Sequence, residues 1–319
     1  MWRYVVKRLI ALLIVLLCVA VIIFCILWFM PGDPAEVILG MNVPEADREA
    51  LRVTMGLKDP FLVQMWRFIR DMFKLDFGTS YQYRVPVTQA FIERLPRTLK
   101  LGLISILIQT VIGIPLGITA AIHRNGLRDQ GLLVSAMVFI SVPQFWLALV
   151  MVILFSVKLG WLPPFGIGSI KFWIMPIAAN SISGIAMNAR MTRSAVLETI
   201  RADFVTTARA KGLAERKVIY KHMLPNALIP VLNGLGMQLG MCVGGTVVIE
   251  NVFSFPGIGQ YMLTGINGFD YPVVRGCVLI LAAVSALMTL LVDLAYGFID
   301  PRIKAQYINY AAKKGGRKK

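Results

Sequence analysis

The residue types that usually perform catalysis or bind metals are few in this chain, and their spacing suits neither task. His123 and His222 are the only histidines, and they lack the HExxH spacing of a zinc site. Four cysteines occur without any Cys-x-x-Cys pair, in or beside apolar runs: Cys18, Cys25, Cys242 and Cys277. We therefore interpret the cysteines as small packing residues and predict no metal site and no catalytic residues.

Phosphate chemistry and ion-driven transport also lack their usual residues. No Gly-x-x-x-x-Gly-Lys-Ser/Thr loop occurs, so we predict that this chain binds no cofactor and does not itself hydrolyse ATP. Glu250 and Asp293 fall at the edges of apolar runs, where each is either a solvated or capped carboxylate or part of a proton relay. Because no carboxylate falls well inside an apolar run, a transporter driven by H+ or Na+ is disfavoured. Energy for any active transport would then come from another protein.

The composition indicates what kind of protein must position these residues. Hydrophobic residues make up 57% of the chain, charged residues make up 16%, and the mean hydropathy is +0.70. These values differ strongly from those of a soluble globular domain and predict an integral membrane protein. Much of the net charge of +16 is explained by topology, because Lys and Arg collect on the cytoplasmic side of membrane proteins. A nucleic-acid partner is therefore not expected.

Six segments have the length and composition of membrane-spanning helices, or come close to it. Such a helix needs about 20 mostly apolar residues, and the segments that approach this without any Asp, Glu, Lys or Arg are residues 9–30, 101–122, 131–157, 172–189, 223–249 and 276–292. The predicted fold is all-α, with six transmembrane helices and an insertion at residues 31–100 between the first two. The insertion is either a small, mainly helical subdomain with short extended pieces near residues 78–87 or a plain connector.

The positions of Lys and Arg predict the orientation. Of the 33 basic residues, 20 fall at the N-terminus, in the loops after the second and fourth segments, and in the C-terminal tail, so both termini are predicted to be cytoplasmic. The first segment is alternatively a cleaved secretory signal, although its uncharged stretch exceeds a typical signal core. The predicted domains are an N-terminal segment with the first helix (1–30), an extracytoplasmic subdomain (31–100), a five-helix core (101–292) that includes a cytoplasmic loop (190–222), and a basic cytoplasmic tail (293–319).

One glycine pattern stands out within the fifth segment. Gly236, Gly240 and Gly244 recur at every fourth position, with Gly245 adjacent to the last. On a helix this spacing forms a strip without side chains, along which another helix backbone can approach closely. The strip either packs against a helix of the same chain or lies at a subunit seam or along a path.

The cytoplasmic loop has a distinctive local pattern. The fourth segment keeps its helical periodicity as it turns polar, so its helix is predicted to project into the cytoplasm. Asp203 is placed to cap a short helix over residues 204–211, which Gly212 can end. A second helix over about residues 214–223 follows, and Pro225 suits the start of the next span. The loop is either a rigid docking element for a soluble partner or an ordinary solvated basic hairpin.

These residues resemble the coupling loop of type I ABC importer permeases. The signature of that loop is Glu-Ala-Ala, three residues, Gly, nine residues and Ile-x-Leu-Pro. It matches Thr206-Thr207-Ala208, Gly212 and the positions His222 to Pro225 here, with the Glu, the first Ala and the Ile replaced. Short motifs similar to those of the dipeptide/oligopeptide/nickel class follow in order at residues 31–34, 77–80, 94–96, 141–146, 159–163, 250–259, 270–272 and 300–302. The chain thus resembles the first-type permease of that class over nearly its whole length.

The resemblance implies a role for the loop and a set of partners. In the family, the short helix sits in a groove on an ATP-binding subunit and carries its motion into the spans. The implied coupling residues are Thr206, Thr207, Ala208, Arg209, Ala210, Lys211, Gly212, Leu224 and Pro225. The implied partners are a homologous second permease, two ATP-binding subunits that use ATP and Mg, an extracytoplasmic solute-binding protein and membrane lipid. The implied location is the inner membrane of a bacterial or archaeal cell.

The function implied by the resemblance is the passage of dipeptides or oligopeptides along the seam between two permeases. ATP hydrolysis would reside on the partner subunits, so this chain would not be an enzyme. Nickel, glutathione and oligosaccharides are alternative cargoes within the same class. A membrane-embedded enzyme or assembly scaffold would need polar catalytic groups that converge within the spans, and the sequence shows none. The sequence assigns no substrate-binding residues.

Overall fold

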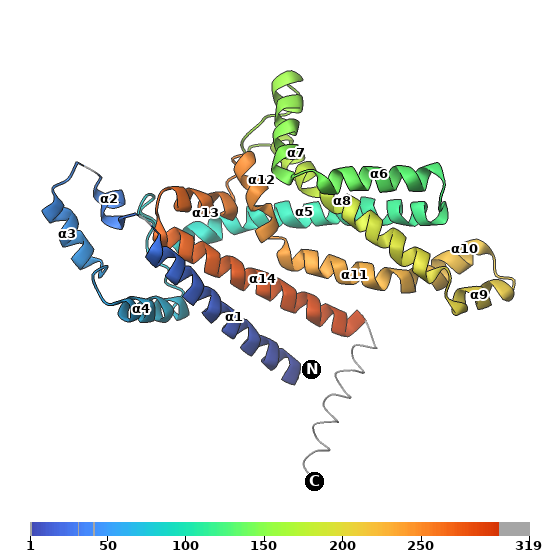
Figure 1. The fold of residues 1–319 in the computed structure, drawn as a ribbon, viewed down its shortest axis with the longest axis horizontal. Coiled ribbons are helices and arrows are strands. Elements are labelled where there is room, and N and C mark those ends of the chain that lie inside the picture. The colour runs from blue at the N-terminus through green and yellow to red at the C-terminus, as the bar shows by residue number, and fades with distance from the viewer. Residues whose placement is uncertain (1, 31, 41, 300–319) are drawn as a thin grey trace, which may run out of the picture. The chain divides into compact units, whose positions relative to one another are not determined.

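The computed structural model describes residues 2–30, 32–40 and 42–299, and these residues form helices joined by loops (Figure 1). One isolated antiparallel bridge, between Thr79 and Pro86, is the described counterpart of the extended pieces predicted near residues 78–87. The chain divides into two compact units. The first unit holds the described residues up to Arg97 and those from Gly257 onward, and the second unit holds residues 98–256. Most of the predicted tail, including the motif at 300–302, lies outside the described residues.

The first unit is built around two long helices that lie side by side, α1 and α14 (Figure 1). Its helices are α1 (Trp2–Phe29), α2 (Pro34–Leu39), α3 (Glu45–Thr54), α4 (Phe61–Phe73), the start of α5 (Val87–Ile122), α13 (Ile258–Asn267) and α14 (Tyr271–Ile299). Arg8 of α1 forms an ion pair with Asp293 of α14, at 2.8 Å between Nη2 and Oδ2. The N-terminal half of α1 therefore lies beside the C-terminal half of α14, and Asp293 is a paired carboxylate.

The segment between α1 and α5 is folded onto the rest of the first unit. The Phe24 ring of α1 lies 5.4 Å from Phe61 and 5.8 Å from Phe68 of α4, measured between ring centroids. The fully buried Asp270, between α13 and α14, accepts hydrogen bonds from Ser80 Oγ at 2.6 Å and from the Gln82 N–H at 3.2 Å. Ring packing at α4 and a buried carboxylate near the start of α5 thus hold the second half of this segment, which supports a folded subdomain over a plain connector.

The second unit is a helical assembly around α8. Its elements are the remainder of α5, α6 (Leu127–Ser141), α7 (Gln144–Met151), a π-helical turn (Val152–Lys158), α8 (Lys171–Thr199), α9 (Asp203–Ala210), α10 (Glu215–Lys217), a second π-helical turn (Val218–Met223), α11 (Leu224–Met241), a 3-10 turn (Gly244–Thr246) and α12 (Val247–Val252). Both α6 and α11 pack along α8 (Figure 1). The continuation of α8 to Thr199 confirms the prediction that the fourth apolar segment extends as helix into its polar part.

Length and hydropathy qualify fewer helices as spans than the six predicted. Within the described residues, three helices could cross a membrane, at Val5–Phe29, Val87–Ile122 and Tyr271–Ala295, or up to five could if each of two bent helix pairs counts as one span. The predicted fourth span, residues 172–189, lies inside α8, which is not among them. The protein is therefore all-helical with three to five candidate spans, and the count of six stays a prediction.

Two of the predicted spans are bent. The segment 131–157 breaks between α6 and α7 by 96°, and the segment 223–249 breaks after α11 by 73°. The first break falls at Val142-Pro143, because the residue before a proline is driven out of the helical region. The second break falls at Cys242-Val243, directly before the adjacent glycines Gly244 and Gly245, which leave the chain easy to bend. Hydropathy counts apolar residues and does not detect such a change of direction.

The seam between α5 and α8 depends on two glycines, one turn apart on α5. A Cβ atom on Gly117 would lie 2.4 Å from the carbonyl oxygen of Ala189, and one on Gly113 would lie 2.8 Å from the Asn188 Cβ. Next to them, Gln109 Nε2 donates to the backbone oxygen of Asn180 at 3.0 Å. Small residues at every fourth position thus let the two helix backbones approach closely.

Replacing Gly117 by leucine should disrupt this seam. Overpacking in a tight interior costs about 1–3 kcal/mol of the free energy of unfolding, so we expect a lower melting temperature of the purified protein in detergent. Gly131 in α6 is the matched control, because no atom lies within 4 Å of a Cβ placed there. The same substitution there, Gly131→Leu, should be neutral or stabilise by up to about 1 kcal/mol, because leucine favours a helix more than glycine does. Equal melting temperatures for Gly117→Leu and the wild type would refute the close approach.

Candidate functional site

The predicted loop folds as a compact hairpin of α9 and α10. Gly212, between the two helices, has a backbone φ of +73°, a conformation that glycine adopts without the steric penalty of a Cβ. Across the turn Arg209 donates from both Nε and Nη2 to the carboxylate of Glu215, at 3.1 and 2.6 Å. Both side chains are substantially exposed, so this pair contributes little to stability. The pair does give Arg209 a counter-charge within the chain. The sequence analysis did not predict Glu215 as that partner.

The start of α9 differs from the prediction by one residue. The residue that precedes the helix is Ala202, which makes no side-chain cap, and Asp203 is the first helical residue instead of the cap. The carboxylate of Asp203 therefore acts through its charge in the first turn, where it complements the partial positive charge of the helix N-terminus. The predicted second helix begins at Glu215 and continues through the π-helical turn into α11, with Pro225 in the first turn of that helix.

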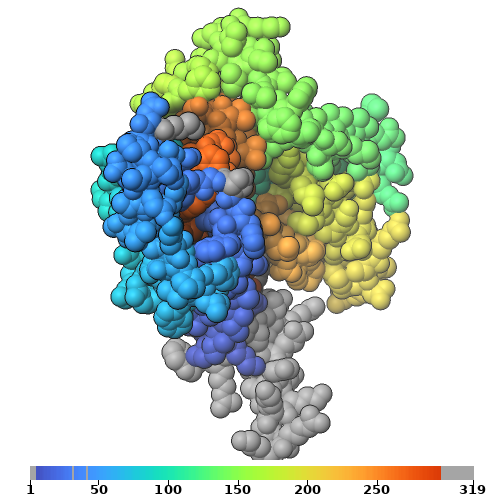
Figure 2. Space-filling view, turned by 60° about the vertical axis from the view of Figure 1, so that its left-hand side comes forward, coloured from blue at the N-terminus to red at the C-terminus, as the bar shows by residue number. Residues whose placement is uncertain are grey.

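The helix α9 has an inner and an outer face. Val205 and Ala208 are buried in a hydrophobic cluster with residues of α5, α8, the second π-helical turn and the start of α11, namely Ala121, Val196, Val218, Met223, Leu224 and Ala227. The other predicted coupling residues on α9 and its turn are exposed: Thr206, Thr207, Arg209, Ala210, Lys211 and Gly212. In the space-filling view this segment, drawn in yellow, lies at the surface (Figure 2). Ala208 and Leu224 thus hold α9 to three long helices, and the outer face is open to a partner.

A buried ion pair lies between the first turn of α6 and α8. Arg193 donates from Nε and Nη2 to the carboxylate of Asp129, the latter at 2.8 Å, and the side chain of Asp129 is only 2% exposed. The Asn125 N–H donates to the same carboxylate at 2.9 Å. The two charged residues are 64 positions apart, so their pairing was not visible in the sequence. The pair fixes the polar extension of α8 to the α5–α6 turn.

Breaking this pair on one side should destabilise the protein more than removing it whole. Asp129→Asn leaves the guanidinium of Arg193 without its counter-charge, which costs up to about 3 kcal/mol, whereas the double variant Asp129→Leu/Arg193→Met should recover part of that loss. Melting temperatures in detergent test both. Arg209→Met, which breaks the exposed pair with Glu215, is the control and should cost less than about 1 kcal/mol. A double variant less stable than Asp129→Asn would contradict the expectation.

The glycine strip of the fifth segment is only partly a helix face. Gly236 and Gly240 are buried in α11, but Gly244 lies in the exposed 3-10 turn after the helix has ended. The strip therefore ends one turn earlier than the spacing suggested. Glu250, on α12 beyond the break, is fully buried and accepts a hydrogen bond from Thr246 Oγ1 at 3.1 Å, so it is a buried, hydrogen-bonded carboxylate rather than a solvated one.

A concave site of the second unit, called the groove below, lies along α8 and α11. It encloses about 410 Å³, and four methionines line it at helical spacing: Met187 and Met191 on α8, and Met237 and Met241 on α11. Gln109, Asn180 and Gln238 add side-chain amides. Among the described residues no group of three His, Cys, Asp or Glu side chains could hold a metal ion. The i, i+4 spacing of both methionine pairs was visible in the sequence, but the pairing of α8 with α11 was not.

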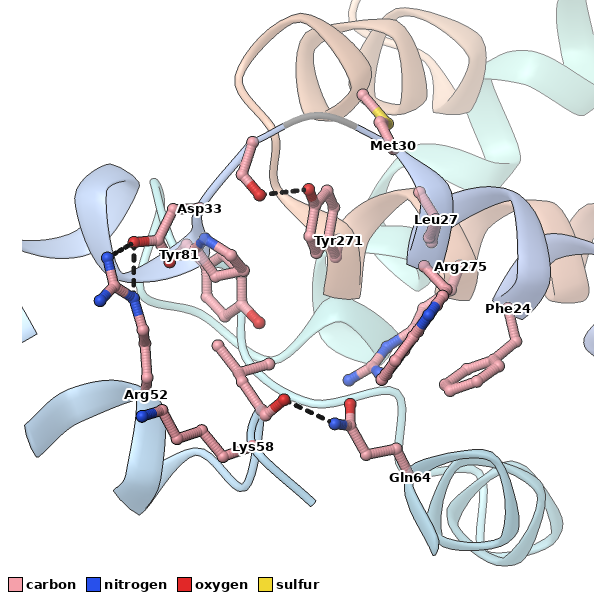
Figure 3. Close-up of a pocket in the computed structure, with 14 residues that line it drawn as sticks. Phe24, Leu27, Met30, Asp33, Arg52, Lys58, Gln64, Tyr81, Tyr271 and Arg275 are labelled. Carbon is pink, nitrogen blue, oxygen red and sulfur yellow. Dashed lines mark hydrogen bonds and ion pairs between the residues drawn. The ribbon is translucent and has the colours of Figure 1, made fainter. Parts of the chain in front are cut away.

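The first unit has its own cavity, of about 500 Å³, between the end of α1, the α2–α4 segment and the start of α14 (Figure 3). On one side of the cavity, Arg52 Nε donates to the carboxylate of Asp33 at 2.9 Å. Tyr271 Oη donates to the backbone oxygen of Gly32 at 3.0 Å. The side chain of Arg275 reaches into the cavity from α14, and its Nε is buried without a hydrogen-bond partner among the described residues (Figure 3). The cavity mixes apolar walls with paired charges.

The Asp33–Arg52 contact makes this region sensitive to acid. Burial raises the pKa of Asp33, but hydrogen bonds from Arg52 and the Ala35 N–H outweigh it, so the pKa lies below its usual 3.8. A carboxyl group whose pKa is lowered by folding stabilises the folded state at pH values above its unfolded pKa. This stabilisation is lost as the pH falls below about 4. We expect α2 and α3 to lose protection from proteolysis in that range, and Asp33→Asn to weaken this pH dependence. An unchanged acid transition in the variant would contradict this assignment.

Comparison with known proteins decides the family. A model of the inner membrane component of binding-protein-dependent transport systems matches residues 113–305, and a model of the N-terminal part of such components matches residues 1–102. The chain belongs to this family of permeases. It is therefore a multi-pass inner-membrane transport subunit and not a catalytic enzyme, which confirms the family resemblance drawn from the motifs.

Relatives agree with this family, and two solved structures have a similar fold. The chain is 39% identical to a glutathione transport system permease protein of Salmonella paratyphi A and 38% identical to a putative peptide transport system permease protein of Brucella abortus, each over 95% of this chain and 99% of the relative. Its fold is similar to that of the MetNI methionine ABC transporter in an inward-facing conformation, with a TM-score of 0.56, 21% identity, and coverage of 66% of this chain and 97% of that one. A histidine-bound amino acid ABC transporter gives a TM-score of 0.50 at 18% identity, covering 67% and 94%.

Proposed function

We infer that this permease imports short peptides or glutathione with energy supplied by separate ATP-binding subunits. The names of its relatives support this cargo class, since one is a glutathione permease and another a putative peptide permease, each aligned over nearly its whole length. The neutral, methionine-lined groove of the second unit is compatible with such cargo. A screen of cargo would also detect transport of nickel or oligosaccharide.

The observation that carries the coupling mechanism is the two-faced helix α9. Its outer face, with Thr206, Thr207 and Ala210, would seat in an ATP-binding subunit, while Val205 and Ala208 anchor its inner face in the hydrophobic cluster. Because the cluster includes residues of α5, α8 and α11, a push on α9 would reach three long helices at once. ATP and Mg would be used by the partner, and this chain would supply only the mechanical connection.

The assembly would contain two ATP-binding subunits, a homologous second permease and an extracytoplasmic solute-binding protein. We propose that α9 and both termini face the cytoplasm and that the α2–α4 subdomain faces outward. The distribution of Lys and Arg supports this orientation. The Arg8–Asp293 pair supports only the part of this proposal that places both ends of the chain on one side, because it brings the N-terminal half of α1 next to the C-terminal half of α14.

Substitutions at Gly212 test the coupling role without crowding the site. No atom lies within 4 Å of a Cβ built there, so any effect comes from the positive φ. Valine disfavours this conformation by about 1–2 kcal/mol, whereas asparagine tolerates it. In the reconstituted importer, Gly212→Val should lower peptide uptake several-fold per ATP hydrolysed, and Gly212→Asn should retain it.

A matched glycine provides the control for Gly212. Gly160 also has a positive φ, of +63°, with open space around it, but it lies in the loop that precedes α8. Gly160→Val should therefore carry the same local strain and keep uptake coupled to ATP hydrolysis. Normal coupling in Gly212→Val would refute the docking role of the α9–α10 turn, and absence of ATP-dependent peptide uptake by the wild-type complex would refute the proposed function itself.

A further inference from the structure

One arginine of the first unit lies within a candidate span and has no counter-charge. Arg275 is on α14, one helical turn inside the span Tyr271–Ala295. Its Cζ lies 5.3 Å from the ring centroid of Phe68, but it forms no ion pair and no hydrogen bond with the residues that the structure describes. Charged side chains are costly within a membrane and are normally paired there, so an unpaired arginine at this depth indicates a binding site for a ligand.

The carboxylates whose charge acts on Arg275 are held by other groups. Three of them lie near it without forming an ion pair: Asp71, Asp76 and Asp270. Asp71 is paired with Arg70 at 2.8 Å, and Asp76 accepts a hydrogen bond from the Gly78 N–H at 3.0 Å. The third carboxylate accepts the two hydrogen bonds described for the fold. Each would have to leave its present contact to neutralise Arg275, which favours a counter-charge from outside the chain.

The cavity into which Arg275 extends has an excess of positive charge. Three cations and one carboxylate line it: Arg52, Lys58, Arg275 and Asp33. Arg52 is paired with Asp33, and Lys58 is paired with Glu49. Arg275 is therefore the cation that is left to attract a ligand, and it suits an anion. The volume of the cavity, about 500 Å³, lies within the usual range of small-molecule sites.

Two donor groups face this cavity. The guanidinium of Arg275 lies between Tyr81 and Gln64, and the hydroxyl of Tyr81 is turned into the same space (Figure 3). Arg275 Nε is enclosed, so its terminal Nη atoms are the ones that can reach a ligand. Burial raises the pKa of Tyr81 to about 12, so its hydroxyl keeps its proton at neutral pH. A guanidinium beside a hydroxyl presents N–H and O–H donors to the oxygens of a phosphate or carboxylate.

The position of the cavity selects the phosphate of a lipid among the possible anions. The cavity lies where the candidate span of α1 ends, at Phe29, and where that of α14 begins, at Tyr271. Span ends lie at the depth of lipid headgroups, where Trp and Tyr rings are favoured, and Trp28 and Tyr271 line the cavity. On α1, Ile22, Ile26 and Phe29 form an exposed apolar stripe that acyl chains can cover. A soluble anion would make no use of this stripe.

We propose that this cavity binds the anionic phosphodiester headgroup of a phospholipid, from the leaflet that adjoins the α2–α4 segment. Arg275 Nη and Tyr81 Oη donate to the phosphate oxygens, and the acyl chains lie along the exposed stripe of α1. A zwitterionic lipid binds less tightly, because its ammonium group brings a positive charge next to Arg52 and Lys58. The bound lipid holds α1, α14 and the α2–α4 segment together. The site does not depend on the identity of the cargo.

Lipid titration followed by native mass spectrometry tests the site. The full-length chain, delipidated in detergent, is titrated with phosphatidylglycerol or with phosphatidylcholine of the same acyl chains. The first phosphatidylglycerol should bind more tightly than phosphatidylcholine. Arg275→Gln should weaken its binding at least about tenfold, because a hydrogen bond to a charged group contributes that much or more. Lys74→Gln is the matched control, since Lys74 is an exposed cation of the same segment that does not line the cavity.

Soluble competitors separate a lipid from a free phosphate ester. Glycerophosphoglycerol, which is the same headgroup without acyl chains, and inorganic phosphate should both compete only weakly. Displacement of phosphatidylglycerol by an equal concentration of glycerophosphoglycerol would overturn the lipid assignment in favour of a soluble phosphate ester. Equal affinity of the wild type for the two lipids, or an equal loss of affinity in Arg275→Gln and Lys74→Gln, would overturn the proposal.

Melting temperatures separate a lost site from a misfolded variant. Without lipid, Arg275→Gln should melt at the temperature of the wild type or above it, because it removes an unpaired charge. Phosphatidylglycerol should raise the melting temperature of the wild type and of Lys74→Gln, but not that of Arg275→Gln. If Arg275→Gln does not fold, Tyr81→Phe removes only the second donor and should weaken phosphatidylglycerol binding several-fold. Unchanged affinity in Tyr81→Phe would then contradict the site.

Discussion

The rest of the second unit depends on the hydrophobic cluster beneath α9. Val205 and Ala208 reach inward to Val196 of α8 and Ala121 of α5, and the π-helical turn continues directly into α11. A short helix of eight residues has little stability of its own. Its position is therefore set by burial against the long helices, and any displacement of α9 must displace them or open the cluster. Under the proposed coupling role, this cluster would carry the motion of α9 into the long helices.

Two further contacts hold neighbouring helices against α8. The Asp129–Arg193 pair fixes the polar end of α8 to the start of α6, and Gly113 and Gly117 bring the α5 backbone against α8. Each contact is of a different kind, charge in one case and close backbone approach in the other, but both converge on α8. Interfaces packed this tightly tend to move as rigid bodies, because interiors resist continuous deformation. The groove of α8 and α11 lies on these same helices, so a displacement of α9 that moved them would also reach the walls of the groove.

Much of this arrangement was predictable from local sequence signals. The extension of α8, the short helix α9 and its end near Gly212 follow from periodicity and glycine chemistry, and the ordered motifs were sufficient to place the chain in its family. The one-residue error at Asp203 reflects the weak definition of helix ends. Other features depend on residues distant in sequence: the Asp129–Arg193 pair, the burial of Ala208 and the meeting of Met191 with Gly234. The helix breaks at Pro143 and just before Gly244 were missed because a hydropathy window measures composition and not direction.

The two faces of α9 also separate two evolutionary demands. Ala208 and Val205 are constrained by packing inside this chain, whereas the side chains of Thr206, Thr207 and Ala210 are exposed and take no part in the hydrophobic cluster. If α9 docks as proposed, drift on the outer surface would retune which ATPase is accepted without any repacking inside the membrane subunit.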